Sequence, residues 1–262
     1  MSQLDFQGIG AMGTLVWGAG NCGELGRLEK VQLIGNLAYV QVREAVDGLR
    51  QHLGLLRPTA TVFDDLFPPR CALVDDALQL AQETHEEALL FHSWRTYFFG
   101  AMLAAHERIE YDPPLFFAAA ILHDVALTKD HSPHLCERCF ALSGGDRVRD
   151  FLNAKGHPHE VGSKVGNAIA LHLNGWVSRK RHGAEAHLVS RGAVCDLFGA
   201  GRRRFAQDTL VQVLTRFPRD GVIEALQFEV AKHRQDTRAA VMTGLSGGKA
   251  PPDPFRNVPG RS

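Results

Sequence analysis

The chain has 262 residues, enough for one sizeable helical core with additions, or for one domain with a small appendage. Hydrophobic residues make up 45% and charged residues 22%, which is ordinary for a globular protein and too polar for a membrane protein. Lys plus Arg and Asp plus Glu number 29 each, so no net charge draws the chain to nucleic acid or to an anionic membrane. We therefore expect a globular protein without a nucleic-acid or membrane partner.

The cysteines and the N-terminal residues bear on the compartment. Five cysteines, an odd and widely spread set, make a poor disulfide framework for a chain of this length. The first residues carry no basic stretch ahead of their apolar part, and no run reaches the ~20 apolar residues of a spanning helix. These features predict a cytoplasmic protein that is neither secreted nor inserted in a membrane.

Residues 1–70 are predicted to form an N-terminal extension with one long helix. Residues 1–24 are rich in glycine and lack a period, so we expect irregular structure with a short extended segment over 14–17. From 25 to 53, apolar residues recur at spacings of three and four, which predicts a helix that Gly54 and Pro58 end. A proline-containing connector then leads to the main domain.

The main domain is predicted to span residues 71–244 and to be all-α. Period-two alternation is nearly absent, and no two-residue hairpin turn has alternating apolar flanks. The final residues, 245–262, combine Gly, Pro and charge without a period, so we expect a disordered tail. Helices of the main domain are predicted near 74–86, 88–108, 114–126, 146–155, 159–173, 184–198, 203–216 and 221–242.

An adjacent His-Asp pair is the first sign of a metal site. His123 and Asp124 follow an almost wholly apolar run at a predicted helix end, so both are expected to be buried. A buried charge needs a partner or a metal ion. The two side chains point about 100° apart around a helix, and both can reach one cation. We predict that they are metal ligands; a hydrogen-bonded pair at a helix end is the alternative.

Two further residues can complete a ligand set. His92 lies in the apolar run LLFHSWRTYFF and Asp196 lies in GAVCDLFGAG. A set of two His and two Asp suits one divalent ion, with zinc first and iron or manganese as alternatives, and leaves room for a water molecule. Such a water is acidified and can attack an electrophilic carbon or phosphorus. A core role for His92 and a turn role for Asp196 are the alternatives.

The ordered series His92, His123-Asp124 and Asp196 resembles the HD-domain superfamily. Within it, FHSWRTYFFG, AAAILHDVALT, AIALHLNG and AHLVSRGAVCDLFG are similar to the cyanamide hydratase branch, over roughly residues 72–200. The resemblance implies an HD-domain helical bundle that holds a single zinc or similar ion. It also implies the addition of water to a nitrile-like or otherwise compact substrate. The chain departs from that branch at Ala141, which replaces an acidic residue, and at Gly145, which replaces alanine.

Three more side chains are candidates for catalysis. His172, on an apolar helix, is predicted to move protons, with a second metal site or a core position as alternatives. Arg95 follows His92 by three residues and can hold an anionic or polar substrate or form a surface salt bridge. Lys129 can contact a phosphate or a polarised oxygen, or be solvated in a loop.

The segment HSPHLCERC offers His131, His134, Cys136 and Cys139 to a second zinc ion. The usual long separation between ligand pairs is missing, which favours a loop over the active site instead.

These features predict a metal-dependent hydratase or hydrolase that acts on a small molecule. The first alternative is a nucleotide or phosphate-ester phosphohydrolase, which needs basic residues aimed at the substrate. The second is a di-iron oxygenase, which needs extra histidine ligands between the His-Asp pair and Asp196. The third is a non-catalytic HD binding or regulatory module with the N-terminal helix as its interaction surface. Homo-oligomerisation is left open.

Overall fold

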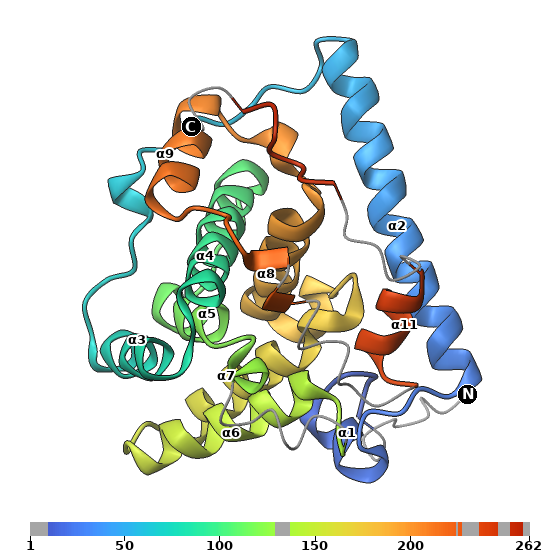
Figure 1. Ribbon diagram of the computed structural model, residues 1–262, viewed down its shortest axis with the longest axis vertical. Coiled ribbons are helices and arrows are strands. Elements are labelled where there is room, and N and C mark those ends of the chain that lie inside the picture. The colour runs from blue at the N-terminus through green and yellow to red at the C-terminus, as the bar shows by residue number, and fades with distance from the viewer. Residues whose placement is uncertain (1–9, 129–136, 224, 227–235, 246–251, 259–262) are drawn as a thin grey trace, which may run out of the picture.

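The all-α prediction is confirmed by a computed structural model of the protein (Figure 1). Helices and short 3-10 turns make up its regular structure, and the described ranges contain no β-strand, only two isolated bridges. No helix in these ranges is both long and apolar enough to span a membrane. The structure describes residues 10–128, 137–223, 225–226, 236–245 and 252–258.

In its described residues the N-terminal extension contains two α-helices, α1 (Leu15–Asn21) and α2 (Arg27–His52), and the short 3-10 helix η1 (Asp64–Leu66). The expectation of irregular or extended structure over 14–17 is wrong. The Thr14 side chain accepts a hydrogen bond from the backbone N–H of Trp17 at 3.2 Å and so caps α1. Leu15 and Trp17 are buried beside side chains of α6, and this packing stabilises a helix too short to form alone. The bounds of α2 agree with the predicted helix.

Eight helices follow α2 within the described ranges. Two begin earlier than predicted: α6 starts at Phe140 rather than near 146, and α8 starts at Arg179 with a kink at Gly183 rather than near 184. Gly144 and Gly145, which weaken a helical pattern in the sequence, lie inside α6. The helices are α3 (Ala72–Thr84), α4 (Glu87–Glu107), α5 (Pro113–Ile121), α6 (Phe140–Ala154), α7 (His159–Leu171), α8 (Arg179–Phe198), α9 (Gln207–Arg216) and α11 (Arg238–Leu245).

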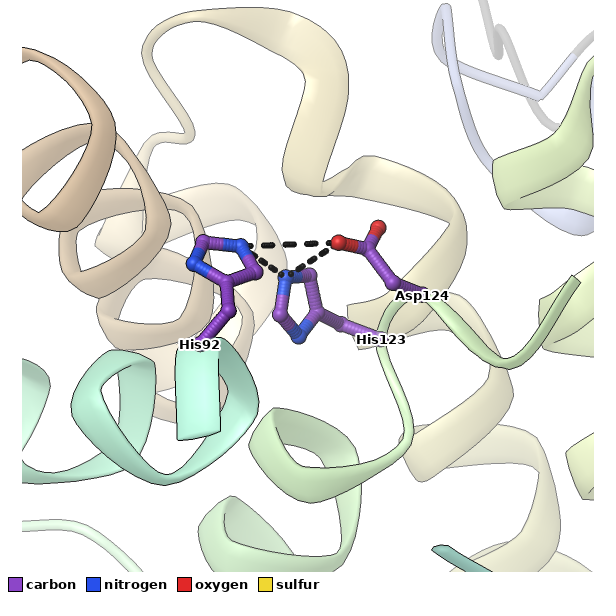
Figure 2. A group of neighbouring side chains, drawn as sticks. All are labelled: His92, His123 and Asp124. Atoms are coloured by element: carbon purple, nitrogen blue, oxygen red, sulfur yellow. Dashed lines mark hydrogen bonds and ion pairs between the residues drawn. The ribbon is translucent and has the colours of Figure 1, made fainter. Parts of the chain in front are cut away.

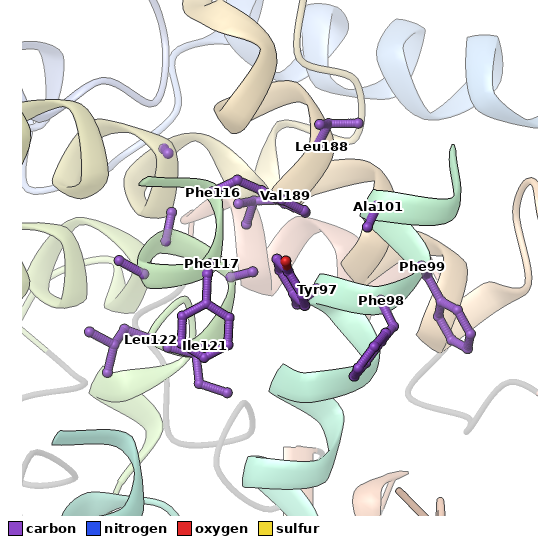
Figure 3. Packing of buried hydrophobic residues seen from close by; sticks show 14 of the residues in the cluster. Tyr97, Phe98, Phe99, Ala101, Phe116, Phe117, Ile121, Leu122, Leu188 and Val189 are labelled. Carbon is purple, nitrogen blue, oxygen red and sulfur yellow. The ribbon is translucent and has the colours of Figure 1, made fainter. Parts of the chain in front are cut away.

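The central helix of the core is α4. Thirteen of its 21 residues are buried, which is why its sequence is apolar on every side. Its aromatic side chains pack against α5 and α8 (Figure 3). Rings such as Tyr97 and Phe117, with centroids 5.1 Å apart, meet edge to face. This packing fixes α4 against the end of α5, where the His-Asp pair lies.

Glycines allow the backbones of α4 and α8 to approach closely. A Cβ atom at Gly192 would meet the backbone carbonyl of Thr96, with its carbon only 2.9 Å away. Gly192→Ala is therefore expected to lower the free energy of unfolding by roughly 1–3 kcal/mol, because backbone cannot yield as a side chain can. Denaturant unfolding measures this. Gly20→Ala is the matched control, since nothing lies within 4 Å of the added Cβ atom, and an equal loss in both variants would contradict the prediction.

Part of the C-terminal segment packs on the core, which corrects the expectation of a disordered tail over 245–262. Phe255 is fully buried and stacks on Phe99 of α4, with ring centroids 5.3 Å apart. Asp253 pairs with Arg219 at 3.3 Å. The polar composition of this segment hid one aromatic anchor, whose burial outweighs the cost of ordering the residues around it.

Ion pairs hold one side of α2 to the rest of the molecule. Glu44 accepts from Arg203 at 3.0 Å, and Asp47 accepts from Arg204 at 2.7 Å. Arg43 pairs with Glu107, at the end of α4, at 3.2 Å. The charged residues in the middle of α2 thus face inward.

Candidate metal centre

The turn after α5 positions the His-Asp pair. Asp112 accepts a hydrogen bond from the Leu115 N–H at 3.1 Å, and prolines at the first helical positions begin α5 there. The helix ends at Ile121, a few residues earlier than predicted. His123 and Asp124 therefore lie in a turn that leads into a 3-10 helix, η2 (Val125–Leu127). Both side chains are buried, as expected.

His92 of α4 joins this pair (Figure 2). Its Nε2 lies 3.2 Å from Nε2 of His123 and 3.4 Å from Oδ2 of Asp124. His123 Nε2 lies 3.1 Å from the same carboxylate oxygen. The three ligand atoms lie within 4.8 Å of one another, so the structure brings three of the four predicted ligands together. We call His92, His123 and Asp124 the metal centre.

The hydrogen bonds at Nδ1 of His92 and His123 determine that the Nε2 atom of each ring, which faces the metal centre, carries no hydrogen. His123 Nδ1 lies 2.8 Å from the carbonyl oxygen of Ala120, and His92 Nδ1 lies 2.6 Å from a carboxylate oxygen of Asp196. Both oxygens only accept, so each Nδ1 carries the hydrogen and each neutral ring leaves a lone pair on Nε2. Two lone pairs and a carboxylate then face one another, and these groups repel unless a cation lies between them. The donor set therefore fits a divalent metal ion.

His172 presents a third lone pair to the other oxygen of Asp124. It lies at the end of α7, in the 3-10 helix η4 (His172–Asn174), and its Nδ1 donates to the Ile169 carbonyl at 2.7 Å. Its Nε2 is 3.5 Å from Oδ1 of Asp124. The ring meets that of His123 edge-on, with centroids 5.0 Å apart. The structure thus places His172 beside the metal centre.

Burial and charge act in opposite directions on these groups. Burial by itself raises the pKa of Asp124, but the neighbouring His123, His92 and His172 outweigh it and hold that pKa well below its usual value. Burial also disfavours charge on His92, yet its hydrogen bonds with Asp124 and Asp196 raise its pKa. Burial lowers the pKa of His172 to about 3. Asp124 is therefore ionised at neutral pH, and the negative charge of the two carboxylates favours a cation among these groups.

Asp196 lies behind His92, on the side away from the metal centre. Its Oδ2 accepts from His92 Nδ1 and, at 3.0 Å, from Arg95 Nη2. Its Oδ1 accepts from Arg95 Nε at 2.8 Å and from Arg219. In this arrangement the carboxylate fixes the orientation of the His92 ring. A ligand role for Asp196 stays a prediction.

Arg95 has a different environment from the predicted one. Its side chain is fully buried, so the alternative of a surface salt bridge is wrong. Its guanidinium donates to both oxygens of Asp196, to the carbonyl of Phe217 at 3.1 Å and to the carbonyl of Pro218. These bonds make Arg95 a positioning residue that acts on His92 through Asp196.

Two residues near the centre were not expected from the sequence. Arg219 donates to the backbone and side-chain oxygens of Asp196, but its sequence context, RFPRDG, is typical of an exposed turn. His85 is buried, its Nδ1 lies 3.0 Å from the Thr84 hydroxyl, and its Nε2 has no hydrogen-bond partner among the described residues. His85 lies just before α4, and the polar residues around it in the sequence gave no indication that it is buried.

Several predicted residues lie outside the described ranges. Lys129 is one of them, and so are His131, His134 and Cys136 of the segment considered for a second zinc ion. The remaining member of that segment, Cys139, is buried, with its Sγ 3.5 Å from a guanidinium nitrogen of Arg238.

The metal centre lies inside the helical core. His92, His123, Asp124 and His172 are each at most 5% exposed. Two surface pockets, one between α1 and α6 and one between α7 and α8, contain none of these residues.

Two buried histidines predict a loss of stability in acid. Burial lowers the pKa of His85 to about 4 and that of His172 to about 3, from 6.5. Between these values the unfolded chain binds more protons, so the free energy of unfolding falls as the pH drops below about 6.5. Each histidine contributes roughly 2 kcal/mol between pH 7 and pH 5. In chelator-treated protein, His85→Gln should remove about 2 kcal/mol of this pH-dependent loss of stability. His159→Gln, at an exposed position, should leave the pH dependence unchanged. Equal pH profiles for wild type and His85→Gln would contradict this assignment.

Comparison with known families agrees with the geometry. Residues 89–215, from α4 to α9, match the family model of the HD domain. This segment contains all four predicted ligands as well as His172. A search of the curated proteins finds no match. The match supports assignment to the HD-domain superfamily, whose members are mostly metal-dependent hydrolases.

Proposed function

We propose that this protein is a metal-dependent hydratase or hydrolase that adds water to a small substrate at the metal centre. The observation that carries the proposal is the convergence of His92, His123 and His172 on Asp124. Each ring donates its Nδ1 hydrogen to an oxygen that can only accept, so three Nε2 lone pairs surround one ionised carboxylate. Buried lone pairs beside a carboxylate destabilise a structural core, whereas a bound cation would stabilise them.

The two imidazoles and the carboxylate would hold one divalent ion, and their borderline character favours zinc over iron or manganese. The bound ion supplies an acidified water and a Lewis acid. Asp196 holds His92 in the tautomer that leaves Nε2 free, and Ala120 does the same for His123. These two hydrogen bonds thus keep both Nε2 atoms free to bind a metal ion.

His172 is the residue we assign to proton transfer. Because burial disfavours charge on the ring, His172 is neutral at pH 7 and its Nε2 lone pair is free to face the attacking water. The Asp124 carboxylate, 3.5 Å away, favours the protonated form of this ring. The proton can then pass to the nitrogen of the substrate.

The substrate we propose is a nitrile-like or other compact C–N compound. The burial of the centre supports a compact molecule. A phosphate ester needs cationic side chains to neutralise its charge. Two of the guanidiniums near the centre, those of Arg95 and Arg219, are instead bound to Asp196. This favours C–N chemistry over the phosphohydrolase alternative.

A substrate screen tests the proposal. The purified protein, loaded in turn with zinc, manganese and ferrous iron, is assayed against nitriles, isonitriles, cyanamide, nucleotides and simple phosphate esters. We expect turnover of a compound with a C–N bond, such as a nitrile, with the amide formed by hydration or ammonia as the product. Turnover of phosphate esters alone would overturn the C–N assignment, and a metal-loaded protein inert towards every class would favour the regulatory-module alternative.

A further inference from the structure

Helix α2 has two faces of opposite environment. One face turns inward, where Leu33, Val40 and Asp47 are buried. The other face is exposed along the whole helix, and α2 runs along one edge of the molecule (Figure 1). Amphipathic surface helices normally place polar residues outward. The outward face of α2 is apolar instead.

Large apolar side chains follow this outward face from one end to the other. Between 47% and 86% of each is exposed, so they contact little within the chain. Single exposed apolar residues are normal on protein surfaces, but a continuous stripe marks an interaction site. The stripe includes Leu28, Val31, Val42, Val46, Leu49 and Leu53.

The spacing of the stripe is that of a helix that pairs with another helix. Apolar residues at 28, 31, 35, 38, 42, 45 and 49 alternate steps of three and four, and all of them are exposed. This 3.5-residue repeat keeps one seam facing a partner helix. Three members of the seam, Gly35, Ala38 and Ala45, are small, so a second helix can approach closely at its middle.

The charges of α2 argue for a neutral protein partner. No exposed residue from 31 to 49 is charged, because Arg43, Glu44 and Asp47 lie on the inward side and form ion pairs within the chain. A helix that rests on a membrane surface carries Lys and Arg beside its apolar face. The stripe has none over this length, and the exposed Arg27 and Arg50 lie only near its two ends, so it fits another uncharged apolar surface.

The area of the stripe matches a stable interface. Its six named side chains with Ile34 and Tyr39 expose roughly 500–900 Å² of apolar surface, at about 60–120 Å² for each. This reaches beyond the largest apolar patch of most monomers, about 300–600 Å². It approaches the roughly 800 Å² that each partner contributes to a standard interface.

We propose that the apolar stripe of α2 pairs with the same stripe of a second copy of this chain. A two-fold pairing requires one surface to be complementary to itself. The stripe meets this requirement because it is neutral, apolar and small at its middle. Pairing of the two helices removes the exposed side chains of both copies from water, which is the driving force for the dimer.

The molar mass of the full chain in solution tests this pairing. Light scattering on eluting wild-type protein at tens of micromolar should give twice the chain mass of 28.8 kDa. Val42→Glu and Ala38→Glu should each give the mass of one chain with unchanged helical content. Gln51→Glu is the matched control: it adds the same charge to an exposed position of α2 on the opposite side from Val42, and it should remain dimeric.

Three results would overturn the proposal. The first is a wild-type monomer at this concentration, in which case sedimentation with phosphatidylcholine and phosphatidylglycerol vesicles would point to a membrane surface. The second is a dimer that neither glutamate variant weakens, which would place the interface elsewhere. The third is a thermal midpoint of the wild type that stays constant as the protein concentration is raised, because the midpoint of a dimer should rise with concentration.

Discussion

Asp196→Ala is expected to lower the free energy of unfolding by roughly 3–5 kcal/mol. The carboxylate accepts hydrogen bonds from Arg95 and Arg219, and both guanidiniums are buried. Removal of the carboxylate leaves the buried guanidinium of Arg95 without its anion and leaves Arg219 with Asp253 as its partner, which costs far more than the net stabilisation from the pair itself. Denaturant unfolding of chelator-treated protein measures this effect apart from metal binding.

The matched control is Asp150→Ala, which removes a carboxylate bound to Arg149 on the surface of α6. Exposed pairs of this kind contribute at most about 1 kcal/mol. A similar small loss for Asp196→Ala would contradict its role as the anchor of Arg95 and His92. Asp196→Asn separates the anchor from the ligand role. If Asp196 only orients His92, the Asp196→Asn variant should bind the metal ion about 10–100-fold more weakly than the wild type. If Asp196 is itself a ligand, the loss of metal affinity should be larger.

His172→Gln is expected to lower kcat by roughly 10²–10⁴-fold, the usual contribution of a general acid or base. Glutamine can still bond the Ile169 carbonyl, but it cannot accept and release a proton at Nε2. Because His172 faces only the far oxygen of Asp124, the metal content of the variant should equal that of the wild type. Steady-state kinetics with the substrate found by the screen, together with metal analysis, measures both quantities.

Two outcomes would contradict the assignment of His172. Unchanged kcat would show that another group moves the proton. Loss of half of the bound metal would instead show that His172 holds a second ion, as the oxygenase alternative requires. His187→Gln is the control, because His187 is also buried and bonded through Nδ1 to a carbonyl, that of Val177, but lies outside the metal centre.

The residues of the metal centre could be predicted because their chemistry conflicts with their surroundings. His92, His123 and Asp124 interrupt apolar runs, and a buried imidazole or carboxylate in such a run needs a partner. The same runs predicted the helices that hold them. Sequence periodicity does not show which nitrogen of a ring faces which partner, since this depends on hydrogen bonds formed between distant helices.

The layer behind the metal centre could not be predicted for that reason. Arg95 lies on the same face of α4 as His92, so a substrate contact was a fair expectation. The structure directs its guanidinium to Asp196 and to the carbonyls after α9, residues more than 100 positions away in the chain. Arg219 reaches the same carboxylate from a segment whose composition indicated an exposed turn. No local pattern contains either contact.

The long helix α2 shows a different limit. Its bounds were predicted from mixed spacings of three and four, but two apolar faces contribute to that pattern. Leu33 and Val40 face the core, whereas Val31 and Val42 face outward. Composition alone cannot separate a face that packs within the chain from one that is left for a partner.

The metal content of wild type, His123→Ala and His187→Ala tests the central claim most directly. Each protein is purified without added chelator and analysed for zinc, iron and manganese by mass spectrometry. We expect about one divalent ion per chain in the wild type and in His187→Ala, and none in His123→Ala. Of these two histidines, His123 belongs to the metal centre and His187 does not. A wild type that binds no metal after incubation with each ion, or a His123→Ala variant that retains it, would contradict the account of this site.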